Sequence, residues 1–350
     1  MPGCARADWR ALASAGLSGC LGLLSLFGLF GLGSVALPAR ASAEADARVW
    51  LERMRSAANS GNYQGTMVFS AGGTMSSSRV WHYRVGDQTY ERLEALDGRQ
   101  QRIFRHNDEV RTLWPQSRVA VVEKRAPMGS WQTLPQAVEP RALENYAFRR
   151  EGAARVADRD AAVFLLEPRD GLRFAQRLWA DQASGLMLRA ETLGPDRQVL
   201  EMTTFSEIEI GVKPQPESVR QAMRKIDGKP DAKEPWRVLR PPQRRTALEA
   251  EGWALRQAVP GFQLAGCVVR GIESAGEEIS VLQAVFSDGL THVSVFVEPY
   301  RADRHRGEGQ AQLGATNTVL RRLGEHWITA VGDVPAATLK LFADALERRR

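Results

Sequence analysis

The side chains with the clearest chemical potential lie within residues 287–299, which read Ser-Asp-Gly-Leu-Thr-His-Val-Ser-Val-Phe-Val-Glu-Pro. His292, Ser294, Phe296 and Glu298 alternate with three valines, so they share one face of a predicted strand. The Asp-Gly pair before them is typical of a tight turn, and the proline ends the strand. An imidazole, a hydroxyl and a carboxylate on one face would suit a catalytic row, a docking surface or a solvated surface.

The rest of the chain offers these side chains no catalytic partners. The sequence has no Gly-x-Ser-x-Gly, no His-Glu-x-x-His, no phosphate-binding loop and no cysteine-histidine group with metal-ligand spacing. The five histidines are scattered, and His82 would point to the polar face of its strand if its neighbours Trp81 and Tyr83 point inward. We expect no catalytic, metal or cofactor site, and a hydrolase that uses His82 or His292 is the enzymatic alternative.

The first 43 residues predict export. Two arginines precede a nearly uncharged apolar run over residues 11–37, which is followed by Ala-Ser-Ala at residues 41–43. This order is that of a secretory signal peptide, so we expect cleavage after Ala43. A retained membrane anchor and lipidation at Cys20 are the alternatives. The mature chain then keeps only Cys267, whose apolar neighbours predict a buried and inert thiol.

Composition divides the mature chain into two domains and a basic segment. Residues 211–245 contain six of the seventeen prolines, with ten Lys or Arg against four Asp or Glu. This composition predicts a solvated, proline-stiffened tether whose arginines are available to an acidic partner or to anionic lipid. Because the charge is local and is not interleaved with aromatic residues, we exclude nucleic acid as a partner. The predicted organisation is a signal peptide at 1–43, an N-terminal domain at 44–210, the linker at 211–245 and a C-terminal domain at 246–350.

Hydrophobic periodicity predicts an α+β fold. A helix over residues 47–58 precedes a succession of short strands separated by turn residues, which predicts a curved, mostly antiparallel N-terminal sheet. This helix and another near residues 134–146 would cover its concave face. The smaller C-terminal domain should end in a helix after Pro335 with Leu339 and Phe342 on its apolar stripe. Strands are predicted at residues 63–70, 79–85, 89–95, 99–105, 109–114, 120–124, 161–167, 173–180, 186–192, 199–210, 253–257, 263–270, 278–286, 291–297 and 326–331.

An apolar interior is expected between the N-terminal sheet and its covering helices. Alternating positions supply large apolar side chains to it, and we assign them as candidate lipid-binding residues. A filled core and a cavity that takes an acyl chain fit the sequence equally. The candidates are Met67, Trp81, Tyr83, Leu93, Phe104, Trp114, Phe164 and Trp179.

Several blocks of this sequence resemble the RseB/MucB family of regulators of the envelope-stress sigma factor. They include Asn-Tyr-Gln-Gly-Thr-Met-Val-Phe at 62–69, Glu-Arg-Leu-Glu-Ala-Leu-Asp-Gly at 91–98, Ser-Asp-Gly-Leu at 287–290 and Val-Gly-Asp-Val-Pro at 331–335. The resemblance spans the mature chain and implies a periplasmic negative regulator that is not an enzyme. Such a protein binds the periplasmic part of a membrane-spanning anti-sigma factor and shields it from site-1 proteolysis. The N-terminal sheet is then expected to be an unclosed half-barrel like that of lipoprotein carriers.

The resemblance also implies the ligands. Lipopolysaccharide or another acylated envelope molecule is expected to release the anti-sigma factor, and a homo-oligomer also fits. The alternative is a periplasmic lipid or lipoprotein carrier. Because the C-terminal domain and the linker are expected to do much of the binding, the candidate partner-binding residues are Arg240, Arg244, Arg245, His292, Phe296, Glu298 and Tyr300.

Overall fold

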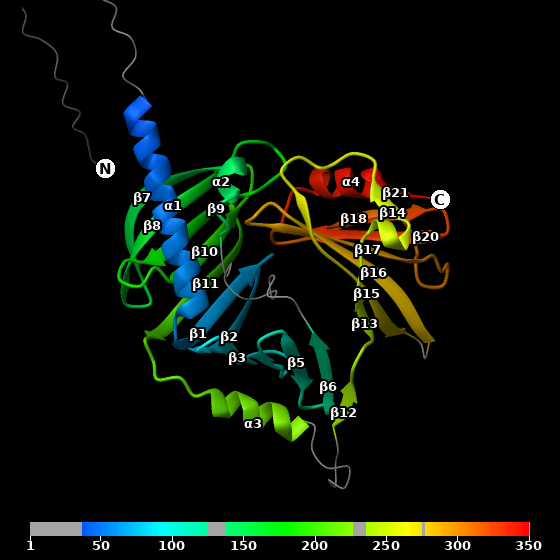
Figure 1. Ribbon diagram of the computed structural model, residues 1–350, viewed down its shortest axis with the longest axis horizontal. Coiled ribbons are helices and arrows are strands. Elements are labelled where there is room, and N and C mark those ends of the chain that lie inside the picture. The colour runs from blue at the N-terminus through cyan, green and yellow to red at the C-terminus, as the bar shows by residue number, and fades with distance from the viewer. Residues whose placement is uncertain (1–36, 125–137, 227–235, 275–276, 350) are drawn as a thin grey trace, which may run out of the picture.

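Two large, mostly antiparallel sheets, a separate two-stranded pair and four α-helices make up the fold, which a computed structural model describes for residues 37–124, 138–226, 236–274 and 277–349. Figure 1 shows the larger sheet beside the smaller one. The larger sheet has twelve strands in the order β12-β6-β5-β4-β3-β2-β1-β11-β10-β9-β8-β7. Its end strands, β12 and β7, do not pair with each other, so the predicted open sheet is confirmed. The first six strands are β1 (Tyr63–Ala71), β2 (Thr74–Val85), β3 (Gln88–Ala95), β4 (Arg102–His106), β5 (Glu109–Trp114) and β6 (Val119–Lys124). The others are β7 (Tyr146–Val156), β8 (Arg159–Pro168), β9 (Ala175–Asp181), β10 (Met187–Leu193), β11 (Val199–Ile210) and β12 (Arg237–Leu239).

Helices α1 (Leu37–Ser60) and α2 (Ala142–Asn145) pack on the larger sheet. Helix α1 buries Leu51 and Met54 in a cluster with Phe164 of β8. It begins earlier than predicted, and the predicted cleavage point after Ala43 falls within it; most of the apolar run before it lies outside the described residues. The helix expected near residues 134–146 is only α2 (Ala142–Asn145) where the structure describes it, and residues 134–137 lie outside the described part.

The basic segment 211–245 is not a solvated tether where it is described. Its apolar residues at helical spacing form α3 (Pro216–Ile226), which buries Val219 and Met223 against Tyr83 and Phe104 of the larger sheet. Strand β12 then pairs parallel to β6, and β13 (Gln243–Arg245) pairs with β15 of the smaller sheet. The proline-rich composition therefore did not reveal that this segment supplies one strand to each sheet. The domain limits themselves stay a prediction.

The smaller sheet has seven strands in the order β13-β15-β16-β17-β20-β19-β18. Its inner face carries Val293, Val295 and Val297 of β17, which pack against Leu339 and Phe342 of α4 (Ala336–Ala345), as the sequence predicts. No helix in the described ranges is long and apolar enough to cross a membrane. The remaining strands are β14 (Trp253–Leu255), β15 (Gln263–Ser274), β16 (Glu277–Ser287), β17 (His292–Pro299), β18 (Gly309–Leu313), β19 (Thr316–Leu323), β20 (His326–Gly332) and β21 (Leu346–Arg348), where β14 and β21 form a separate pair and η1 (Glu249–Glu251) is a short 3-10 helix.

Candidate functional site

The outer face of the smaller sheet, opposite α4, carries the side chains that the sequence singles out. The strand β17 alternates, so the valines face α4 whereas His292, Ser294, Phe296 and Glu298 face outward. Helix α4 therefore does not cover Phe296, which is half-buried.

Cross-strand pairing connects this face to the basic segment. Arg245 pairs with Val268, Val268 pairs with Gln283, and Gln283 pairs with Phe296. Directly paired residues point to the same face of a sheet. The structure thus brings two of the predicted partner-binding residues, Arg245 and Phe296, onto one face although they are far apart in sequence.

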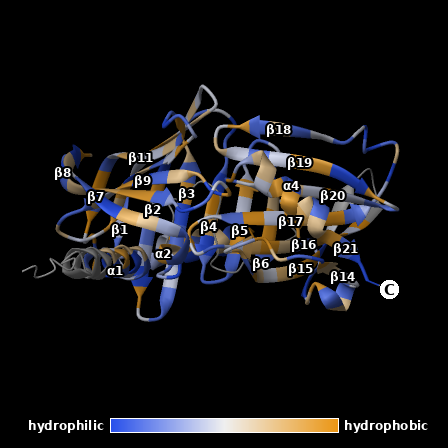
Figure 2. Ribbon diagram, turned by 90° about the horizontal axis from the view of Figure 1, so that it is seen from above, coloured by the Kyte–Doolittle hydropathy of each residue, from blue (hydrophilic) through white to orange (hydrophobic). Residues whose placement is uncertain are grey.

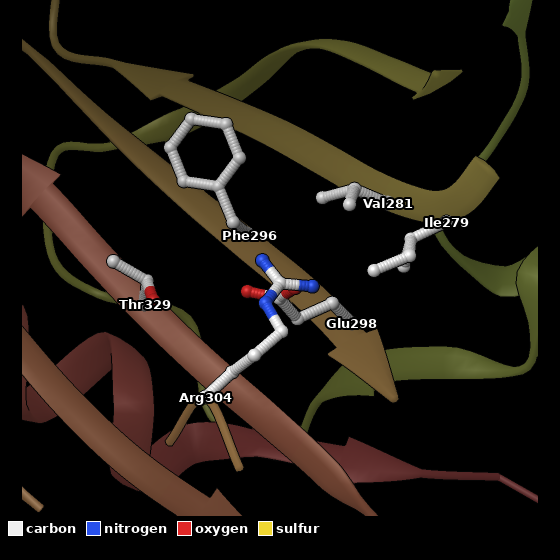
Figure 3. A pocket seen from close by; sticks show the side chains of 6 residues that line it. All are labelled: Ile279, Val281, Phe296, Glu298, Arg304 and Thr329. Carbon is white, nitrogen blue, oxygen red and sulfur yellow. The ribbon is translucent and has the colours of Figure 1, made fainter. Parts of the chain in front are cut away.

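A pocket of about 210 Å³ lies on this outer face. Phe296 of β17 and Ile279 and Val281 of β16 supply its apolar walls, and Thr329 of β20 closes one side. Figure 3 shows the Arg304 guanidinium beside the Glu298 carboxylate at the pocket. The pocket has room for one large apolar side chain of a ligand, and the adjacent Arg304–Glu298 pair can fix the orientation of that ligand.

Glu298 lies between the Arg304 guanidinium and the His305 ring, and Arg304 compensates its charge within the site. Its carboxylate lies 3.5 Å from Arg304 Nη1 and 3.4 Å from His305 Nε2. The backbone N–H of Arg301 donates to His305 Nδ1 at 2.9 Å, which leaves the ring proton on Nε2, facing Glu298. The imidazole stacks on Trp327 at 4.7 Å. Glu298 therefore lines the pocket and also holds Arg304 and His305 against the sheet.

The other predicted partner-binding residues are divided. His292 is exposed on the outer face, and Tyr300 follows the strand, under the Arg322 guanidinium. Arg244 donates to Glu251 at 2.7 Å from the opposite side of β13, because side chains alternate along a strand. Arg240 is exposed between β12 and β13.

The Asp-Gly turn before β17 lies at the contact between the two sheets. Asp288 and Arg173 of the N-terminal region are both fully buried, with Arg173 Nε donating to Asp288 Oδ2 at 2.6 Å. The Tyr146 hydroxyl donates to the same oxygen at 3.2 Å, and burial raises the pKa of Tyr146. Gly289 has a φ of +97°, and a Cβ there would lie 2.8 Å from Arg141 Cγ, so the turn requires glycine. We call Arg173, Asp288 and Tyr146 the interdomain hub.

The eight candidate lipid-binding residues do not line one common space. Seven of them fall into three packed clusters, and Trp114 is half-buried outside them. The assignment of these residues to lipid stays a prediction. Phe164 packs with α1; Met67, Leu93 and Trp179 form a second cluster; and Trp81, Tyr83 and Phe104 pack with α3.

His82 does not point to a solvated face, because both faces of β2 are covered around residues 80–83. The residue is only 4% exposed, and its Nδ1 lies 3.0 Å from Glu91 Oε1. Arg105 Nη1 donates to the other carboxylate oxygen at 3.3 Å. Burial opposes ionisation of Glu91, but His82 and Arg105 outweigh it and lower the pKa of this carboxyl. His82, Glu91 and Arg105 thus form a buried polar network, and Tyr63 stacks on His82.

The described residues hold no group of His, Cys, Asp and Glu that could bind a metal ion. Cys267 is buried as the sequence predicts, and burial, with two nearby glutamates, raises the pKa of its thiol to about 11. The pocket beside Phe296 suits binding through a half-buried apolar face.

The sequence profile of the MucB/RseB N-terminal domain matches residues 46–223, and that of the MucB/RseB C-terminal domain matches residues 247–347. The chain belongs to the MucB/RseB family. Its similarity to individual members of the MucB/RseB family extends over most of each chain. The Pseudomonas aeruginosa protein named sigma factor AlgU regulatory protein MucB is 29% identical over 320 residues, 89% of this chain and 94% of that protein. The Haemophilus influenzae sigma-E factor regulatory protein RseB is 25% identical over 317 residues, 90% of this chain and 96% of that protein.

Two solved structures of family members resemble the fold. The complex of Pseudomonas aeruginosa MucA and MucB is 26% identical, with a TM-score of 0.65, and the match covers 87% of this chain and 99% of that one. A crystal structure of MucB with MucA(peri) gives a TM-score of 0.64 at 26% identity, with 87% and 100% coverage. The family resemblance stated from the sequence is thus confirmed, and it places the fold of both sheets within one known architecture.

Proposed function

We propose that this protein is a periplasmic regulator that binds the periplasmic part of a membrane-spanning anti-sigma factor. The observation that carries the proposal is the family membership of both halves of the chain. Two solved structures of the relative MucB are complexes with MucA.

The outer face of the smaller sheet is the docking surface in this proposal. Phe296 and the pocket beside it would accept an apolar side chain of the partner, and Arg245 at the far side of the face would contact an acidic group. Large aromatic side chains that become fully desolvated in a well-packed interface carry a disproportionate share of its binding energy. Bound in this way, the partner would be shielded from site-1 proteolysis.

Lipid is the proposed releasing signal. Lipopolysaccharide or another acylated envelope molecule would bind the N-terminal region, and each ligand would weaken the other by the same factor because the two binding equilibria are linked. The interdomain hub supports this coupling, since it joins the region of the predicted lipid site to the turn that begins β17.

The test is a titration of the mature protein with the purified periplasmic part of the host's own anti-sigma factor. We expect Phe296→Ala to weaken binding by about tenfold or more, whereas Leu341→Ala, an apolar truncation on the exposed side of α4, should leave affinity unchanged. Thermal unfolding of both variants checks that the fold is retained. Lipopolysaccharide should weaken wild-type binding and restore site-1 cleavage, and affinity that does not change with lipopolysaccharide would contradict the release mechanism.

A further inference from the structure

Within the described part of the chain, the two large sheets end in four edge strands, which are β12 and β7 in one sheet and β13 and β18 in the other. An edge strand presents unpaired N–H and C=O groups and is a template for pairing with another chain. Natural proteins blunt such edges with charged side chains, prolines, bulges or very short strands. The sequences of the four edge strands therefore indicate which of them can pair with a strand of another chain.

Three of the edges are protected. Strand β7 has a register shift between Arg150 and Gly152 and charged side chains on either side of it. Strands β12 and β13 have three residues each and contain arginines, and two prolines lie between them. Each device hinders the addition of another strand.

Strand β18 has none of these devices. It reads Gly-Gln-Ala-Gln-Leu, all five residues are exposed, and it pairs with β19 without a register shift. Figure 2 shows it at the outer margin of its sheet. Five residues of regular, uncharged edge are thus open over about 17 Å.

The hairpin geometry shows which backbone groups are free. Gly314 and Ala315 form a two-residue turn between β18 and β19, so Leu313 and Thr316 are a hydrogen-bonded pair. Pairs alternate along an antiparallel ladder, which leaves the N–H and C=O groups of Gln310 and Gln312 directed away from β19.

The open edge ends at the contact between the two sheets. Leu313 is 62% exposed, and its Cδ1 lies at the β1–β2 turn, where a Cβ on Gly72 would be 2.8 Å from it. Met75 at the start of β2 is 70% exposed, and Val199 at the start of β11 is 49% exposed. A chain that continues past β18 would therefore meet apolar side chains of the larger sheet.

We propose that an extended segment of the anti-sigma factor's periplasmic part adds to β18 as an eighth strand of the smaller sheet. The proposal rests on the proposed function and specifies how the partner is held. Main-chain hydrogen bonds to Gln310 and Gln312 fix the strand, and an apolar residue of the partner covers Leu313. A second copy of this chain is a poorer occupant, because a five-residue edge alone buries far less than the roughly 1,200 Å² of a stable dimer.

The test is Gln310→Pro, with Gln310→Ala as its matched control. Proline removes the outward N–H and blocks an added strand, yet the β18–β19 hydrogen bonds remain because position 310 does not contribute to them. Alanine removes the side chain and keeps the N–H. We expect Gln310→Pro to raise the dissociation constant for the anti-sigma periplasmic part by about tenfold or more, and Gln310→Ala to change it less than about twofold.

Amide hydrogen exchange gives a readout that needs no variant. The amides of Gln310 and Gln312 should exchange fast in the free protein and become protected when the anti-sigma periplasmic part is bound. Unprotected amides, or full affinity of a folded Gln310→Pro variant, would overturn the edge-strand proposal while wild-type binding still supports the proposed function. A wild-type protein that does not bind would instead refute the proposed function. Loss of a dimer in Gln310→Pro with unchanged partner affinity would assign the edge to a second copy and overturn the proposal.

Discussion

Replacing Asp288 by Asn should destabilise the protein far more than the same change in a surface ion pair. Asp288 and Arg173 have no exposed side-chain surface, and their atoms approach to 2.6 Å. The amide keeps the volume of the carboxylate and the Oδ1 that accepts from the N–H groups of Leu290 and Thr291. It places a donor, however, against Arg173 Nε and the Tyr146 hydroxyl.

The magnitude follows from the burial of Arg173. Without the Asp288 charge, its guanidinium keeps Asp170, the Pro260 carbonyl and the Phe262 ring, which compensate it only in part. Removing one partner of a buried ion pair costs about 3–5 kcal/mol. We expect Asp288→Asn to lower the free energy of unfolding by that amount, measured by urea unfolding with circular dichroism and tryptophan fluorescence.

The control is Asp158→Asn, which removes the same charge from a pair with Arg155 that is 66% and 92% exposed. Asp158 has a φ of +64°, which Asn tolerates, so we expect a cost of at most about 1 kcal/mol. In the double variant Arg173→Met/Asp288→Asn, the cost should be smaller than the sum of the single changes by about 1 kcal/mol or more. A cost below about 1 kcal/mol for Asp288→Asn would refute the reasoning, because the hub would then be no stronger than a surface pair.

Three further predictions concern single groups. Burial and the charge of Asp333 raise the pKa of Glu201 to about 7. The neutral carboxyl therefore contributes its full stability below pH 4.5, and this contribution is lost as the pH rises through 7. After allowance for partial exposure, we expect the free energy of unfolding of Glu201→Gln to exceed that of the wild type by about 1–2 kcal/mol at pH 8 and to equal it at pH 4, measured by unfolding titrations at both pH values. Because the pKa of Cys267 is raised to about 11, Ellman's reagent at pH 8 should label the folded protein slowly and the urea-unfolded protein fast, and equal rates would contradict burial of the thiol. Val219→Asn in α3 should cost about 2–4 kcal/mol, whereas exposed Gln221→Asn should cost under 1 kcal/mol; equal effects would mean that α3 does not anchor on the sheet.

Periodicity predicted most of the elements that bury one face. Most strands of the larger sheet lie where apolar residues alternate between turn residues, and Val293, Val295 and Val297 are in the core as expected. Strands β7 and β18 were missed because exposed edge strands have no apolar alternation to reveal them. Helix α3 was missed for another reason: its apolar spacing was present, but the surrounding prolines and charges suggested a tether.

The candidate site was predicted only as far as one strand allows. Phe296 and Glu298 were identified from β17 itself, whereas Val281, Thr329 and Arg304 join the pocket through strand register and a loop. Register depends on pairings between residues distant in sequence, which local patterns do not encode. The position of Asp288 in a buried ion pair likewise required a partner 115 residues away.

The strands β12 and β13 impose a mechanical constraint on the whole molecule. Only Arg240, Pro241 and Pro242 separate Leu239, which is paired into one sheet, from Gln243, which is paired into the other. Four consecutive Cα steps span at most about 14 Å, so these two margins cannot part further unless a strand detaches. This three-residue connection therefore limits how far these two margins separate if one sheet rotates against the other, and the limit is weaker at points farther from it.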